Sequence, residues 1–232
     1  VGITLLSIIT AVSILGPYIV PYDPTAIHSN HILEGPSAQF LLGTDALGRD
    51  LLSRVIIGGR TSLLLGFGSV GIALGLGVPI GLTAGYARGR IDEGIMRAMD
   101  IIMSIPTLLL GLLILTALSS NVWNAIFAVG VVYAPRIARV VRSATLEETN
   151  SEYVQSAIAQ GESTPYILFR EILPNITAPI IVKGSIRVGF AILIGSSLSF
   201  LGLGPQPPNA DWGYMINTAR EHIFQSPWYL LW

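Results

Sequence analysis

The most constraining feature of this chain is a series of apolar segments, each about as long as a membrane span. A helix rises about 1.5 Å per residue and needs roughly 20 apolar residues to cross about 30 Å of hydrocarbon. Lipid offers backbone polar groups no water, so such segments must be helices. Five segments approach this length, at about 1–20, 61–86, 99–118, 123–141 and 184–203. We therefore predict an all-α integral membrane protein with five spans, and the apolar stretch 228–232 predicts the start of a sixth.

The composition supports this class of protein. The 232 residues are 51% hydrophobic and only 12% charged, which is too apolar for the surface of a soluble domain. A formal net charge of -1 gives no basic excess to attract nucleic acid. With zero cysteines, the chain has no disulfide, no thiolate metal site and no cysteine nucleophile.

The first span is expected to stay in the mature protein as an anchor helix. It lacks the basic start and the Ala-x-Ala exit of a cleaved signal peptide. The chain also starts without methionine, so we expect that residues precede it. These features divide the chain into a first transmembrane helix at 1–21, an extracytoplasmic loop at 22–60 and a core domain at 61–232.

The distribution of Lys and Arg predicts how the spans are oriented. Nine of these residues lie in the segments on one side of the predicted spans and four on the other. Cytoplasmic loops carry the excess of positive charge. We therefore place the loops around 88 and between 136 and 187 in the cytoplasm, and the segments 22–60 and 205–227 outside.

Glycines are concentrated in the second span. The run 66–71 matches the dinucleotide fingerprint G-x-G-x-x-G, but that motif needs a strand, a turn and a soluble helix, whereas these glycines lie in a lipid-length helix. Small residues four apart instead predict close helix packing. Such pairs are Gly71/Gly75, Gly77/Gly81 and Gly81/Gly85.

The loop between the fourth and fifth spans, about 144–183, is too long and too polar for a simple turn. Its pattern predicts one helix over 146–160 that Gly161 ends as a left-handed cap. Ser163 or Thr164 then caps a second, short helix that has Pro165 in its first turn and closes at Leu173-Pro174. Its apolar side is formed by Tyr166, Ile167, Phe169 and Ile172. Such an amphipathic helix either fits a groove on a partner or lies on the bilayer surface, and the pattern alone leaves both readings open.

Residues 152–161 (EYVQSAIAQG), followed by ILPN at 172–175, resemble the EAA loop of bacterial ABC importer permeases. In that family, this loop carries the coupling helix that docks on the ATPase subunit. Gly161 and Leu173-Pro174 match the motif in type and spacing. The family's opening Glu-Ala is replaced here by Gln155-Ser156, which removes a salt-bridge candidate.

Two further blocks narrow the resemblance. The segment 42–50 (LGTDALGRD) and the segment 199–204 (SFLGLG) are similar to the second, C-type permease of dipeptide, oligopeptide and nickel importers. Relatives often have a glutamate at the position of Gly195, and its absence removes a candidate charged group from the pathway. The resemblance implies the type I ABC importer transmembrane fold and a transport subunit with no catalytic residues.

The resemblance also implies a set of partners and contact residues. Expected partners are a homologous second permease in a heterodimer, two cytoplasmic ABC ATPases that hold ATP and Mg, an extracytoplasmic substrate-binding protein and the lipid bilayer. No cofactor, metal or nucleic acid is expected on this chain. The location implied is the cytoplasmic (inner) membrane of a bacterium or archaeon. The residues expected to couple to the ATPase are Ala157, Gly161, Glu162, Ser163, Pro165, Tyr166, Phe169, Leu173 and Pro174.

Several polar residues in or near the spans have two readings. Ser104, Ser196, Ser197 and Ser199 either line the translocation pathway or bond back to their own helices. Asp100 with Arg97 is expected to be an anchoring pair at the entry of the third span, with a substrate ligand as the alternative. The arginines at 136, 139 and 142 are expected to anchor this boundary to lipid phosphates, with a gate or an ATPase contact as the alternative.

Two other function classes are disfavoured. A membrane-embedded hydrolase would need a polar constellation, such as paired histidines and carboxylates facing one cavity, and no predicted span contains one. A secondary transporter driven by an ion gradient would show intramembrane carboxylates on broken helices and an internal repeat, and the sequence shows neither. A metal site at His28 and His31 is disfavoured, because two histidines in a loop are usually only solvated. The sequence leaves the cargo open among dipeptides, oligopeptides, glutathione and nickel.

Overall fold

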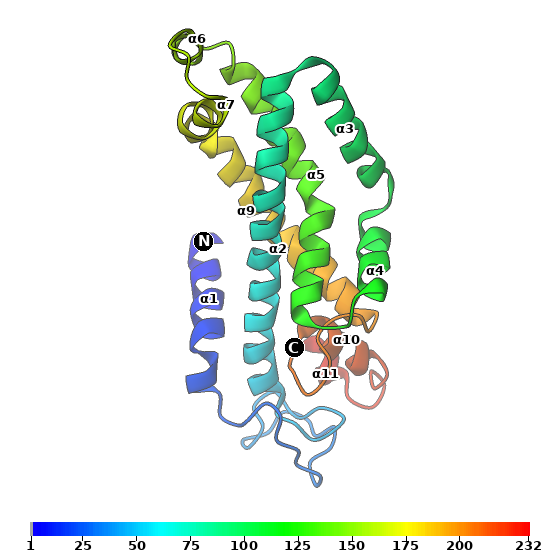
Figure 1. The fold of residues 1–232 in the computed structure, drawn as a ribbon. Helices are drawn as coiled ribbons and strands as arrows, with labels where there is room; N and C mark the ends of the chain where they lie inside the picture. Colours follow the sequence, from blue (N-terminus) through cyan, green and yellow to red (C-terminus); the bar gives the residue numbers. More distant parts are fainter. Residues whose placement is uncertain (1) are drawn as a thin grey trace. The chain divides into compact units, whose positions relative to one another are not determined.

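The computed structural model describes residues 2–232, and Figure 1 shows their fold. Within that range the regular elements are all helical, and the one isolated bridge pairs Thr44 with Asp50. The all-α prediction is confirmed. The helices are α1 (Gly2–Ile19), α2 (Leu51–Ala87), α3 (Gly89–Ser104), α4 (Thr107–Ala117), α5 (Val122–Glu148), α6 (Glu152–Ala159), α7 (Thr164–Tyr166), the π-helix η1 (Ile167–Ile172), α8 (Leu173–Asn175), α9 (Thr177–Phe200), α10 (Trp212–Arg220) and α11 (Pro227–Leu231).

Three helices, α2, α5 and α9, are long and apolar enough to cross a membrane. The first predicted span corresponds to α1, whose apolar part is shorter. The third predicted span, 99–118, is wrong as a single straight helix, because α3 and α4 meet at an angle of 89°. The break follows from Pro106, which disfavours helical backbone at the residue before it, and Ile105 is extended with φ -82 and ψ 132.

The contacts divide the chain into two compact units. The first unit takes in the chain up to Leu65 together with Leu112–Ala125 and Ile192–Trp232. The second unit consists of Gly66–Gly111 and Ile126–Ala191. Several long helices therefore contribute to both units.

In the first unit, α2 begins ten residues earlier than the predicted second span. The prediction of a loop over 22–60 is thus wrong for residues 51–60. Sequence reasoning treated the charged Arg54 as a loop residue, but its side chain is only 1% exposed and lies 3.4 Å from Asp45. Because the Asp45 carboxylate neutralises its charge, Arg54 can be buried in a packed helix. The same stretch packs on α1, where a Cβ added to Gly16 would lie 2.8 Å from Ile56.

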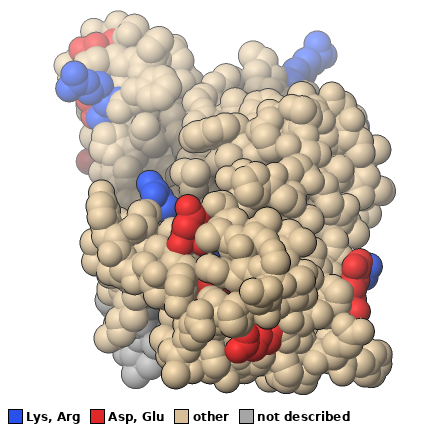
Figure 2. Space-filling view, turned by 90° about the horizontal axis from the view of Figure 1, so that it is seen from below, with Lys and Arg blue, Asp and Glu red and all other residues tan. Residues whose placement is uncertain are grey.

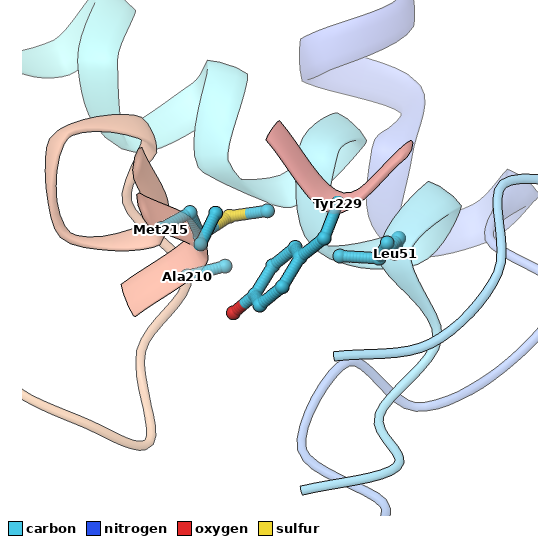
Figure 3. Packing of buried hydrophobic residues seen from close by; sticks show 5 residues of the cluster. Leu51, Ala210, Met215 and Tyr229 are labelled. Atoms are coloured by element: carbon cyan, nitrogen blue, oxygen red, sulfur yellow. The ribbon is translucent and has the colours of Figure 1, made fainter. Parts of the chain in front are cut away.

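The first unit has its own apolar cluster near the chain's carboxyl-terminal helices. Leu51 of α2 packs with Ala210, with Met215 of α10 and with Tyr229 of α11 (Figure 3). The Trp212 indole donates to the Val55 carbonyl at 2.9 Å, which ties α10 to the first turns of α2. Figure 2 shows that the end of the molecule carrying α10 and α11 has only scattered charged side chains on an otherwise uncharged surface.

In the second unit, α2 and α5 run parallel and pack backbone to backbone. A Cβ added to Gly77 would lie 2.7 Å from the Ala134 carbonyl, and one added to Gly85 would lie 2.8 Å from the Arg142 carbonyl. Gly81 lies equally close to α5 between them. The predicted close packing is therefore confirmed for Gly77, Gly81 and Gly85. Gly71 and Gly75 pack against no described helix of this chain, because Cβ atoms added there meet nothing within 4 Å.

Candidate functional site

The segment between α5 and α9 forms a compact helical loop within the second unit (Figure 1). The predicted first helix, 146–160, is wrong at its start, because residues 146–148 belong to α5 and a turn precedes α6. The turn follows from the run Thr149-Asn150-Ser151, whose side chains bond to the local chain. The Thr149 hydroxyl, for example, donates to the Thr145 carbonyl at 2.6 Å.

The end of the second loop helix also differs from the prediction. The helix does not close at Leu173-Pro174 but continues through η1 and α8 to Asn175. The turns before the proline are π-helical, with Leu173 N–H bonded to the Leu168 carbonyl. Wider turns of this kind accommodate a proline inside a helical segment. At the start, Pro165 lies in the first turn as predicted, and Ser163 occupies the cap position without a side-chain cap bond.

Gly161 ends α6 in the left-handed conformation, as predicted, with φ +80. Its N–H donates to the Ile158 carbonyl at 3.0 Å, and the next N–H, of Glu162, donates to the Ala157 carbonyl at 3.1 Å. This pair of bonds is a Schellman motif and satisfies carbonyls that the helix end would otherwise leave unpaired. The motif fixes the direction in which the chain leaves α6.

The loop has its own small apolar core. Val154 and Ala157 of α6 are buried, as are Ile167, Leu168 and Ile172 of η1. Each helix therefore turns one side inward, and α6 and η1 contact each other. Two short helices that share a core form a stiff body. Ala157, one of the residues expected to couple to the ATPase, belongs to this core. It therefore supports the exposed residues of the loop and is not itself available for contact.

Large apolar side chains remain exposed on the outer side of the loop. Tyr166 is 42% exposed and Phe169 is 50% exposed, although the sequence pattern placed them on one apolar side with Ile167 and Ile172. Among the other residues expected to couple, the structure places Leu173 half-buried, and it exposes Gly161, Glu162, Ser163, Pro165 and Pro174. We call the surface formed by Gly161–Pro165, Tyr166 and Phe169 the outer loop surface.

The loop is tied to the end of α5 through Tyr153. The Tyr153 hydroxyl donates to Glu148 Oε2 at 2.6 Å, and the Gln155 side-chain amide donates to the Thr149 carbonyl at 2.9 Å. Burial and the neighbouring Glu148 carboxylate raise the pKa of Tyr153 to about 12. The phenol is therefore a neutral donor at physiological pH. This bond joins the first loop helix to the long helix before it.

The loop is acidic. Residues 144–176 contain five glutamates and one arginine, a formal charge of -4. Glu152 is exposed at the start of α6, Glu162 is exposed just beyond its end, and Arg170 of η1 is also exposed. A partner that contacts this region would meet apolar groups together with carboxylates.

Sequence reasoning missed a row of polar contacts between α3–α4 and α5, all within the second unit. The predicted pair Asp100–Arg97 is wrong. Arg97 pairs with Glu93 at 2.6 Å, because a glutamate four residues before an arginine is well placed on a helix, and Asp100 pairs with Arg139. The row, which we call the α3–α5 ladder, consists of the ties Arg88–Asn150, Asp92–Arg142, Asp100–Arg139 and Thr107–Arg136. The sequence signal was the arginine spacing of three at 136, 139 and 142, although their partners lie far away in sequence.

The four serines considered for a pathway lie in different settings. The Ser104 and Ser197 hydroxyls donate to carbonyls of their own helices at 2.7 and 2.8 Å. Ser199 is buried and donates to Asp211, which also caps α10. Ser196 is half-buried. Three of the four hydroxyls thus have partners within the chain.

A recess of 390 Å³ in the first unit is lined by apolar side chains together with several uncharged polar groups. These come from Thr61 of α2, from Ser120 and Asn121 before α5, and from Gln206 and Asn209 after α9. The sequence did not indicate this recess, because three distant segments build it.

The two loop histidines belong to an aromatic cluster in the first unit. The rings of His28 and His31 each lie 5.3 Å from Phe40. His31 Nδ1 also lies 2.5 Å from Glu34 Oε2. Over residues 2–232, no group of three or more His, Cys, Asp or Glu side chains is placed to hold a metal ion.

Long apolar helices joined by a stiff loop define a membrane-spanning transport subunit of the type I ABC importer fold. The same fold occurs in a solved inward-facing structure of the MetNI methionine ABC transporter, with a TM-score of 0.64, 18% sequence identity, and coverage of 77% of this chain and 87% of that chain. Residues 77–231 match the family described as "Binding-protein-dependent transport system inner membrane component". The chain belongs to this family of ABC importer permeases.

Curated relatives resemble the chain along nearly its whole length. The di/tripeptide transport system permease protein DppC of Pseudomonas aeruginosa is 40% identical, over 98% of this chain and 77% of its own length. The dipeptide permease DppC of Haemophilus influenzae is 38% identical, over 98% of this chain and 79% of its own length. The glutathione permease GsiD of Pectobacterium atrosepticum is 39% identical, over 95% of this chain and 73% of its own length. None of these relatives supports the alternative of an ion-gradient-driven secondary transporter.

Proposed function

We propose that this chain is the permease subunit of an importer for short peptides, which ABC ATPases drive through the loop 149–176. The proposed substrate class rests on the names of the relatives that resemble nearly the whole chain. They are named for di/tripeptide, dipeptide and glutathione transport. Their named cargoes share a peptide backbone. Nickel uptake is not named for these relatives.

The geometry of the loop supports its role in coupling. A link that transmits force must keep its shape, and the Schellman motif and the core around Val154 and Ile172 supply this stiffness. The exposed Tyr166 and Phe169 are aromatic anchors of the kind that dominate interfaces. The competing reading, a helix resting on lipid, fits less well, because residues 149–176 carry three glutamates against one arginine, and this formal charge of -2 repels an anionic bilayer surface.

The remaining assignments follow from the proposal. The loop and the α3–α5 ladder lie on the cytoplasmic side of the inner membrane of a bacterium or archaeon, and two ATPases hold ATP and Mg. A homologous second permease completes the pathway as a heterodimer. The segments 22–50 and 205–227 face outward, where a substrate-binding protein delivers cargo by alternating access.

Reconstitution tests the proposal. The chain is purified with its second permease, ATPases and binding protein, and placed in proteoliposomes. We expect uptake of a labelled dipeptide that requires both ATP and the binding protein. Uptake driven by a proton or sodium gradient without ATP would contradict the ATPase-driven mechanism.

A paired substitution tests the docking surface separately. We expect Tyr166→Ser with Phe169→Ser to weaken ATPase co-purification about 30-fold, because buried aromatic anchors contribute about 2 kcal/mol or more. Ile223→Ser is the matched control, since that side chain is 40% exposed, close to the exposure of Tyr166, but lies outside the loop. Equal ATPase recovery from both variants would place the docking surface elsewhere.

A further inference from the structure

The α3–α5 ladder joins two helices along much of their length. From one tie to the next, residue numbers rise on α5 while they fall on α3 and α4, so the two run antiparallel. The outermost tie reaches beyond α5, where Arg88 Nη2 donates to Asn150 Oδ1 at 2.8 Å in the turn before α6. The row therefore ends at the base of the loop 149–176.

Helix α3 lies between two sharp changes of chain direction. At its start, Arg88 and Gly89 both have positive φ, 53 and 57, which is unusual for an arginine. At its end lies the break before Pro106, where the axis turns by 89°. A backbone conformation of this kind costs about 1–3 kcal/mol and persists only where the surroundings hold it. The bond from Arg88 to Asn150 is one such restraint.

The tie between Asp92 and Arg142 is the strongest of the four by geometry. Two bonds connect them: Arg142 Nη2 lies 2.5 Å from Asp92 Oδ2, and Arg142 Nε bonds Oδ1. Their side chains are 12% and 31% exposed, against 57% and 51% for Asp100 and Arg139. Forked bonds with less solvent screening are both stronger and more directional. The backbone of Arg142 is itself fixed against Gly85 of α2.

We propose that the α3–α5 ladder is a strut that transmits movement of the loop to the bent α3–α4 segment, with Asp92 and Arg142 as positioning residues for transport. This inference rests on the proposed coupling function of the loop. When an ATPase moves the loop, α5 and Asn150 move with it. The ladder makes α3 move together with α5 rather than independently of it.

The surroundings of the ladder supply a matched control. The ladder borders a hollow of 530 Å³ lined by Asp92, Glu93, Met96, Arg97, Asp100, Arg139 and Arg142. Arg97 and Glu93 form an ion pair at the same hollow, but both belong to α3 and tie it to nothing else. Arg97→Gln therefore removes an equivalent charge from the hollow and leaves the strut intact.

The test uses the complete complex in proteoliposomes and measures dipeptide taken up per ATP hydrolysed. We expect Arg142→Gln and Asp92→Asn to lower this ratio about tenfold, the size of effect known for residues that couple distant sites. ATP hydrolysis and complex assembly should persist. Arg97→Gln should stay within about twofold of the unaltered complex. An unchanged ratio in Arg142→Gln and Asp92→Asn would overturn the proposal.

A rescue experiment separates a strut from a merely stabilising pair. The chain has no cysteines, so Asp92→Cys with Arg142→Cys provides two unique thiols. A short bifunctional thiol reagent that bridges them should restore the uptake ratio lost in the unbridged variant. A bridged complex that remains uncoupled would overturn the proposal.

A readout that needs no cargo separates this proposal from the proposed function. Gly94→Cys places a thiol on the exposed side of α3, where an added Cβ meets nothing within 4 Å. Its rate of labelling should change when ATP is added to the assembled complex, and Arg142→Gln should abolish that change. An equal change in labelling rate with and without Arg142→Gln would overturn the proposal that the ladder is a strut. Failure of the unaltered complex to take up dipeptide would count only against the substrate.

Discussion

The irregular segment 20–50 and the loop 149–176 are both long connections, but they are stabilised in opposite ways. The first buries charge: Asp45 is 0% exposed, accepts from Arg49 at 2.7 Å and lies beside Arg54. Arg54 also donates to the carbonyls of Pro24, 30 residues away, and Pro208, 154 residues away. The loop instead relies on local caps and a small core, and it exposes its aromatic side chains. A segment held by distant contacts suits a fixed platform, whereas a locally stable one can move as a body.

The largest expected effect is the loss of the buried charge in the first region. Arg54→Met should lower the free energy of unfolding by about 3 kcal/mol, because it removes a positive charge beside the buried Asp45 carboxylate and leaves the Pro24 and Pro208 carbonyls without their donor. Thermal denaturation of the purified protein measures this loss. Arg60→Met, at an exposed position six residues further along α2, is the control and should change stability by less than about 0.5 kcal/mol. Equal melting temperatures for both variants would mean that the buried network contributes little.

A smaller effect is expected from the cap that shapes the loop. Gly161→Val should destabilise the turn by about 1–2 kcal/mol, because left-handed backbone is strained in a branched residue. Gly161→Asn is the control, since asparagine tolerates this conformation and an added Cβ meets nothing within 4 Å. Hydrogen exchange of the loop amides measures the change. We also expect dipeptide uptake per ATP to fall in Gly161→Val while membrane insertion persists, and normal uptake would contradict the coupling assignment.

The contrast between local and distant contacts also explains what the sequence could predict. The cap at Gly161, the proline in the first turn of α7 and the close packing at Gly77, Gly81 and Gly85 depend on local spacing, and all were predictable. The same periodicity could not say that Gly71 and Gly75 would face open space, because it does not reveal which helix lies opposite.

The wrong predictions share a physical origin in tertiary contacts. Asp92 and Arg142 are 50 residues apart, and only the fold brings them together. The start of α2 was placed too late because Arg54 reads as a loop residue until its buried partner Asp45 is known. The break at Pro106 was the exception, since the restriction on the residue before a proline is local and could have been applied.

The smallest expected effect concerns the bond between α6 and the end of α5. Tyr153→Phe removes the donor to Glu148 and should cost the loop about 0.5 kcal/mol, because the bond is partly exposed to water. The pKa of Tyr153 is raised from 10.0 to about 12, so the folded protein keeps this proton where an unfolded chain loses it. The bond's contribution to stability is therefore complete below pH 10 and is lost as the pH rises towards 12.

Tyrosinate absorbance in the ultraviolet tests whether Tyr153 keeps its proton at pH 10. The difference between the unaltered protein and Tyr153→Phe should show no ionisation of Tyr153 at pH 10, where an ordinary tyrosine is half ionised. If removing Tyr153 lowered the tyrosinate signal at pH 10, the phenol would not be held by Glu148, and α6 would be free to move without α5. The loop would then resemble a flexible tether more than the rigid body that its caps and core describe.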